Sequence, residues 1–118
     1  MKVLLNQTLA DIEGKTIREG GEEKGVEFTL KKIVINALLG NYQDEVNLSG
    51  EEKLKRWEMA LTIKTAESTL DLKSEDIALI KKLIAKLYAV TIVGQAWKML
   101  EKEVVEEYVD KKGSILDA

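Results

Sequence analysis

Residues 74–89 read "SEDIALIKKLIAKLYA" and show the clearest helical periodicity in the chain. Apolar side chains recur there every three or four positions and therefore share one face of a helix. Glu75 and Asp76 fall in the first turn, where the helix dipole favours negative charge. With Ser74 as the N-cap, the stretch predicts an amphipathic helix packed on a core. The predicted inward face comprises Ile77, Ile80, Leu83, Ile84 and Leu87.

The preceding stretch, "NLSGEEKLKRWEMALTI" at 47–63, predicts a second helix. Ser49 is followed three residues later by Glu52, the capping-box spacing, so the helix should begin near Gly50. Arg56 stands four residues after Glu52 and is expected to form an ion pair with it on the outer face. Trp57 then belongs to the core rather than to a nucleic-acid surface. Its predicted companions on the inward face are Leu54, Ala60 and Leu61.

A further helix is predicted over 30–39, with Thr29 as its N-cap and Gly40 as its C-terminal stop. Its expected inward face is Leu30, Ile33, Val34, Ala37 and Leu38.

The first 28 residues have a different character, with short apolar or β-branched segments separated by turn residues. The segments at 2–6 and 15–19 flank a turn at 10–14, and a glycine-rich loop at 20–25 precedes a possible strand at 26–28. This pattern predicts an N-terminal β-hairpin or meander.

A fourth helix is predicted over 92–112, with Thr91 as its cap and Gly113 as its end, and Gly94 could allow a close crossing of another backbone. Its apolar arc is wider than one packed partner requires. Either this helix is deeply embedded, or its far half meets a second copy or another protein. The residues of this candidate interaction surface are Trp97, Leu100, Val104, Val105, Tyr108 and Val109.

These segments predict a mostly helical α+β fold, in which an N-terminal hairpin region (1–28) is followed by four helices (29–112) around one core. The expectation is a single domain over 1–113 with a frayed tail at 114–118. The chain of 118 residues has 45% hydrophobic and 33% charged residues, which fits a globular protein of this size. No apolar run approaches the ~20 residues that span a bilayer, and no signal peptide is evident, so we expect a cytoplasmic protein.

The inventory of reactive side chains is small, since cysteine and histidine are absent. Thiol chemistry, zinc–thiolate sites and histidine acid–base catalysis are thereby excluded. The loop 41–52 has polar residues at the spacing of an EF-hand, but its sixth position is Val46 where glycine is needed and its first is Asn41 instead of aspartate. The glycines at 20–25 lack the lysine and hydroxyl of a phosphate loop. We expect no catalytic residue, metal or cofactor.

Lysines occur in pairs at Lys31–Lys32, Lys81–Lys82 and Lys111–Lys112. If the fold gathered them on one side, together with Arg56, they would form a patch that could bind nucleic acid. The net charge of −3 gives no general attraction to phosphate or anionic lipid, so nucleic-acid binding is the weaker alternative.

The succession "LLNQTLADIEGKTI", "TLKKIVINALLG", "LSGEEKLKRWEMALTI", "LDLKSEDIALIKKLIAKLYA" and "VGQAWKMLE" resembles a family of small, mostly uncharacterised proteins of tailed bacteriophages and prophages. The resemblance extends to about Glu101 and implies a phage protein that acts in the host cytoplasm. The function expected is a non-catalytic protein–protein interaction module, for example a tail-assembly chaperone, with a phage or host partner or a second copy. A nucleic-acid-binding regulator and an acidic inhibitor of a host enzyme are the alternatives.

Overall fold

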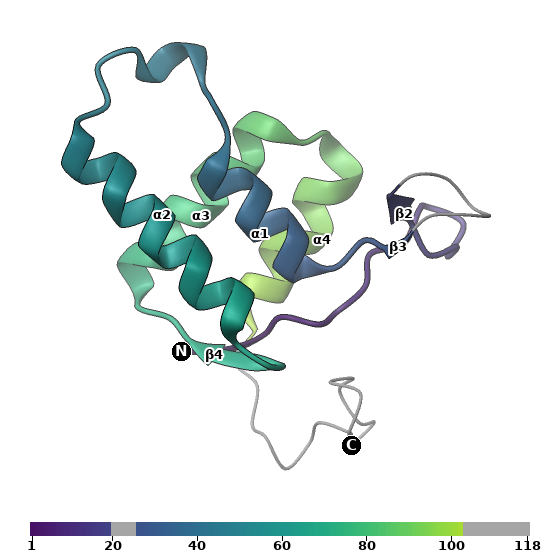
Figure 1. Ribbon diagram of the computed structural model, residues 1–118. Coiled ribbons are helices and arrows are strands. Elements are labelled where there is room, and N and C mark those ends of the chain that lie inside the picture. Colours follow the sequence, from purple (N-terminus) through teal and green to yellow (C-terminus); the bar gives the residue numbers. More distant parts are fainter. Residues whose placement is uncertain (20–25, 103–118) are drawn as a thin grey trace.

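Four helices make up most of the structure, a computed structural model that describes residues 1–19 and 26–102 (Figure 1). The predicted mostly helical α+β class with four helices is confirmed. None of the helices in the described part of the chain is both long and apolar enough to cross a lipid bilayer. The helices are α1 (Leu30–Leu39), α2 (Gly50–Thr65), α3 (Ser74–Leu87) and α4 (Val90–Glu101), with a short 3-10 turn η1 (Gln43–Glu45) between the first two.

Helix α1 occupies the middle of the bundle and contacts the other three helices (Figure 1). Thr29 caps it as predicted, since its hydroxyl accepts a hydrogen bond of 3.3 Å from the backbone N–H of Lys32. The predicted inward face is confirmed and is fully buried. Its residues are Leu30, Ile33, Val34, Ala37 and Leu38.

Helix α3 packs against α1 and contributes its apolar face to the core. Ile77, Ile80, Leu83 and Ile84 are buried as predicted. Leu87, the last residue of α3, is 44% exposed, and the following Tyr88 packs against the core instead. Ser74 lies inside the helix and Lys73 is the N-cap, without a side-chain hydrogen bond, so the prediction of Ser74 as cap is wrong.

The sheet joins segments that are far apart in the sequence. Strand β1 (Lys2–Leu4) pairs antiparallel with β4 (Thr69–Asp71), with Val3 opposite Leu70. The sequence predicted that the first strand would pair within an N-terminal hairpin. That prediction is wrong, because β1 pairs with β4 instead. The continuous apolar run that includes Val3, Leu4 and Leu5 is completely buried, and a hairpin with one face in water would have left part of it exposed.

A second antiparallel pair is only two residues long, with β2 (Arg18–Glu19) beside β3 (Val26–Glu27). The segment before it turns at Gly14, whose φ of +89° is a conformation that residues with a side chain rarely adopt.

Helix α4 begins at Val90, with Ala89 as its N-cap, so Thr91 is not the cap that the sequence predicted. Gly94 makes no close crossing, since within the described residues no atom lies within 4 Å of a Cβ built there. The helix ends at Glu101, and Lys102 is extended. The predicted continuation over 103–112, Gly113 and the tail at 114–118 lie outside the described residues.

Candidate protein-interaction surface

Helix α2 packs with a different face inward from the one its sequence pattern predicts. It begins as predicted, because the backbone N–H of Glu52 donates to the Ser49 hydroxyl at 3.1 Å. Of the predicted inward face only Ala60 is buried, and the rest of the prediction is wrong: Leu54, Trp57 and Leu61 are 56%, 52% and 43% exposed. The side chains that α2 buries are Arg56, Ala60 and Ile63.

The buried arginine is matched by a carboxylate from the loop between α1 and α2. Arg56 Nη1 and Nη2 donate to the two carboxylate oxygens of Glu45 at 2.8 and 2.6 Å. The arginine and glutamate side chains are only 6% and 14% exposed. A bidentate salt bridge of this geometry is among the stronger polar contacts in proteins. It replaces the ion pair between Arg56 and Glu52 that the sequence predicted.

The charges around this pair keep both groups ionised. Hydrogen bonding to Arg56 lowers the pKa of Glu45 against the opposing effect of burial, and the same bond raises the pKa of Arg56. Lys86 on α3 adds a second cation, 2.8 Å from Asp44 and 3.8 Å from Glu45. The ionic cluster therefore fastens the loop to both α2 and α3.

Tyr42 fixes the beginning of the same loop. Its hydroxyl donates to the backbone carbonyl of Ala37 at 2.7 Å, and the Lys86 ammonium lies 5.5 Å from the centre of its ring. Burial, followed by the charge of Glu45, raises the pKa of Tyr42. Gly40 ends α1 as predicted, but for a different reason. Its φ is −67°, and a Cβ there would lie 2.7 Å from the Tyr42 hydroxyl, so glycine is needed for space.

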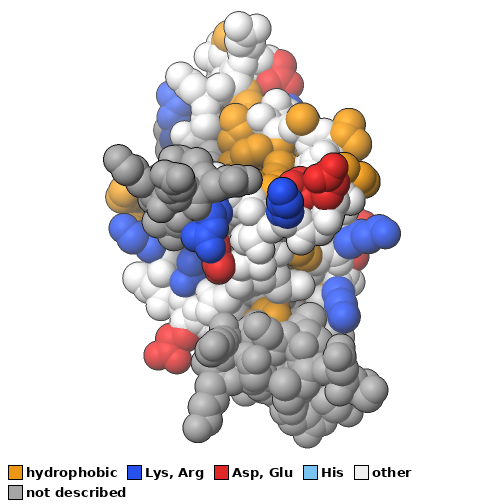
Figure 2. Space-filling view, turned by 90° about the vertical axis from the view of Figure 1, so that its right-hand side faces the viewer, with side chains coloured by type: hydrophobic (Ala, Val, Ile, Leu, Met, Phe, Trp, Pro, Cys, Tyr) orange, Lys and Arg blue, Asp and Glu red, His pale blue; other side chains and the backbone are white. Residues whose placement is uncertain are grey.

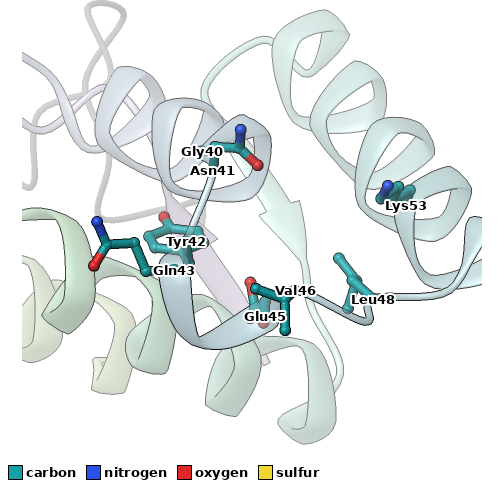
Figure 3. A pocket seen from close by; sticks show the side chains of 8 residues that line it. All are labelled: Gly40, Asn41, Tyr42, Gln43, Glu45, Val46, Leu48 and Lys53. Carbon is teal, nitrogen blue, oxygen red and sulfur yellow. The ribbon is translucent and has the colours of Figure 1, made fainter.

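Two adjoining hollows lie between this loop and α2. The first, of about 320 Å³, has loop side chains on one side and Lys53 of α2 on the other (Figure 3). The second, of about 260 Å³, is lined by Leu39 and Trp57. The residues common to both are Gly40, Asn41, Leu48 and Lys53.

An exposed apolar row runs along α2 beside these hollows. We call Leu54, Trp57 and Leu61 the α2 stripe, since their spacing of three and four residues places them on one face. Leu39 and Val46, which line the hollows, are exposed as well. A tryptophan in the centre of an apolar row, next to a recess, is typical of surfaces that bind proteins.

The candidate surface predicted on α4 is largely internal where the structure describes it. Trp97 is half-buried, and its indole N–H donates to the Lys81 carbonyl at 3.0 Å. The Lys81 ammonium lies 4.6 Å from the centre of the indole ring. Leu100 is fully buried in the core. The other four predicted members, Val104, Val105, Tyr108 and Val109, lie outside the described residues.

Another group of hydrophobic side chains gathers over the face that carries the turn between α3 and α4 (Figure 2). Ile12 and Val90, 98% and 87% exposed, line a shallow hollow of about 440 Å³. Gln95 holds the turn that contains Ile12 against α4, because its amide both donates to and accepts from the backbone of Ala10, at 2.6 and 3.0 Å. Ile12 and Val90 come from separate segments and do not line up along one helix face as the residues of the α2 stripe do.

Two of the paired lysines interact with oxygen atoms of the chain itself. Lys31 donates to the carbonyls of Lys64 and Ala66 at the end of α2. Lys81 pairs with Glu101 at 2.5 Å. Lys111 and Lys112 lie outside the described residues. Among residues 1–19 and 26–102, no group of three or more acidic side chains is placed to hold a metal ion.

Comparison of the chain with protein-family models, with curated proteins and with solved structures finds no match. The resemblance to small phage and prophage proteins therefore stays a prediction, and the geometry of the α2 surface is the basis for a functional proposal.

Proposed function

We propose that this chain is a non-catalytic protein-binding module whose binding surface is the α2 stripe with the hollows beside it. One observation carries the proposal: Trp57 is half-exposed in the middle of an apolar row, although buried positions exist on the same helix. Exposure of a large aromatic side chain to water is unfavourable in an isolated protein, and burial in a partner would recover that free energy.

The surface is held in shape before any partner arrives. The salt bridge between Arg56 and Glu45 links the loop between α1 and α2 to the buried side of α2. The hydrogen bond from Tyr42 to Ala37 links the same loop to the end of α1. A preorganised recess loses less conformational entropy on binding than a mobile one. This supports recognition of a folded or helical partner.

The ionisable groups at this surface are suited to structure rather than to proton transfer. Both carboxylate oxygens of Glu45 accept hydrogen bonds from Arg56, and the lowered pKa of Glu45 keeps that group ionised at neutral pH. A general acid or base needs a pKa near the working pH and access to substrate. The composition adds to this argument, since histidine and cysteine are absent from the chain.

The biological role that we propose is an assembly factor, for example a tail-assembly chaperone, acting on a phage or host protein in the host cytoplasm. The resemblance to phage proteins supports this setting. Nucleic-acid binding has less support, because Lys31, Lys81 and Lys86 interact with carbonyl or carboxylate groups of the chain itself.

The proposal is tested by affinity capture from cells that encode the protein, with the wild-type chain, Trp57→Ser and Val90→Ser as baits. Val90→Ser is the matched control, since it removes an even more exposed apolar side chain from a different face. We expect a partner to be retained by wild type and Val90→Ser and lost with Trp57→Ser. Equal retention by all three baits would count against the α2 surface, provided that their thermal unfolding shows that all are folded.

A further inference from the structure

The α2 stripe has charged edges of opposite sign. Lys53 precedes Leu54 on the side of the helix nearest the hollows, and Glu58 follows Trp57 on the other side. Within the described residues neither side chain forms an ion pair, and both are exposed. In heptad notation Leu54, Trp57 and Leu61 take the positions a, d and a, so Lys53 is at g and Glu58 at e, the positions that select partners in coiled coils.

From this pattern we infer that the occupant of the α2 surface is a second copy of this chain, with the two α2 helices side by side and parallel. The inference rests on the proposed function, because it names the partner of the same surface. In a parallel pair related by a two-fold axis, each apolar residue of the stripe meets its own equivalent. The g position of one helix then faces the following e position of the other, which brings Lys53 next to Glu58 of the second copy, twice.

The antiparallel alternative is disfavoured by the same charges. In an antiparallel pair each edge of the helix faces the equivalent edge of the other copy. Glu58 would then approach Glu58 of the second copy, and Lys53 would find no acidic neighbour. Like charges in contact oppose association and act as a specificity device.

The hollows add a reason for the second copy to approach on this side. Lys53 and Trp57 line the 260 Å³ hollow together, so the basic edge of the stripe borders a recess rather than a flat surface. The acidic edge of the second copy, which includes Glu58, would lie over that recess. Close packing of two helices requires that side chains of one copy fit into recesses between side chains of the other, and the edge with Glu58 would do so here.

The charges are tested by sedimentation velocity of the full chain over a range of concentrations at low salt. We expect reversible dimers, and we expect Lys53→Glu and Glu58→Lys each to weaken association about tenfold or more by bringing like charges together. The double variant restores the complementary pair and should associate nearly as well as wild type. Lys55→Glu, an exposed change on the opposite face of α2, is the control and should have no effect.

The orientation is tested by cross-linking, which the absence of cysteine makes simple. In a parallel pair position 54 meets itself, so Leu54→Cys should form an intermolecular disulfide under mild oxidation, whereas Lys55→Cys should not. Stronger association of Glu58→Lys than of wild type, or no disulfide through position 54 in a dimer, would overturn the parallel arrangement. A strict monomer at high concentration overturns the inference altogether. If that monomer still captures another protein through Trp57, the proposed function stands without it.

Discussion

Arg56 lies beneath the surface that the adjacent Trp57 presents to water, and it reaches back to Glu45 through two hydrogen bonds of 2.8 and 2.6 Å. This contact spans eleven residues and accompanies the burial of the α2 face that also carries Ala60 and Ile63. A buried guanidinium without a counter-charge would be strongly unfavourable, so the loop carboxylate makes the observed packing possible. Trp57 lies about 100° around the helix from the buried Arg56 and is 52% exposed.

The losses in stability from removing the two members of this ion pair should not be additive, because each single removal leaves the other charge buried without its partner. Glu45→Gln leaves the Arg56 charge buried without its counter-charge and close to Lys86, and we expect a loss of about 3 kcal/mol in the free energy of unfolding. Combined with Arg56→Met, the loss should be smaller than the sum of the two single losses by about 1 kcal/mol or more. Urea unfolding of the four proteins measures this coupling, and strictly additive losses would contradict it.

The same pair predicts a specific dependence of stability on pH. Because the pKa of Glu45 is lowered in the folded protein, its stabilising contribution is complete above the usual glutamate value of 4.5 and is lost as the pH falls through the folded value. The stability difference between wild type and Glu45→Gln should therefore shrink as the pH falls below 4.5, through the lowered pKa of Glu45. The pKa of Asp71 is also lowered, through its hydrogen bond to the terminal amino group, so both proteins lose stability in acid. Only their difference reports Glu45, and a difference that stays constant over this range would argue against the ion pair.

The register of α2 can be checked by two truncations on the same helix. Ile63→Ala removes a fully buried side chain and should cost about 3 kcal/mol. Trp57→Ala removes a half-exposed one and should cost about 1 kcal/mol or less, in contrast to the 3–5 kcal/mol typical of a core tryptophan. Chemical denaturation of both variants gives the ranking, and a larger loss from Trp57→Ala would restore the register that the sequence pattern predicted.

Gly40 should be intolerant of even a methyl group. A Cβ at this position would lie 2.7 Å from the Tyr42 hydroxyl and 2.9 Å from its ring carbon, so Gly40→Ala must displace the ring and its hydrogen bond to Ala37. We expect a loss of about 1–3 kcal/mol in the free energy of unfolding, typical of overpacking. Gly50→Ala is the control, since within the described residues a Cβ at Gly50 meets nothing within 4 Å. Similar stabilities of the two variants would show that Tyr42 moves aside at little cost.

The sequence best predicted the helix features that depend on interactions between residues close together in the chain. Thr29 and Ser49 each cap the helix that follows them, because a side-chain oxygen three residues before a backbone N–H needs no other part of the chain. The buried face of α3 has a single apolar stripe, so only one face could be turned inward. Ser74 is not the N-cap of α3, because the helix begins one residue earlier than the sequence pattern predicted and Lys73 takes the cap position.

The orientation of α2 could not be read from its own residues. Two apolar rows compete there: Leu54, Trp57 and Leu61 form the more hydrophobic one, while Ala60 and Ile63 share a face with Arg56. Periodicity favours the first row. A signal for the second existed in Glu45, a carboxylate in the preceding loop, but its distance from Arg56 is known only once the loop is folded. The candidate surface on α2 was missed for this reason.

By itself the sequence determined a mostly helical fold, the start of two helices through their caps, the core faces of α1 and α3, and the lack of cysteine and histidine chemistry. Only the tertiary structure decided that β1 pairs with β4 and that α2 buries its arginine and exposes its tryptophan. The physical reason is the range of the interactions. Caps and single apolar stripes act within a few residues, whereas strand pairing and a buried ion pair depend on which distant groups the folded chain brings into contact.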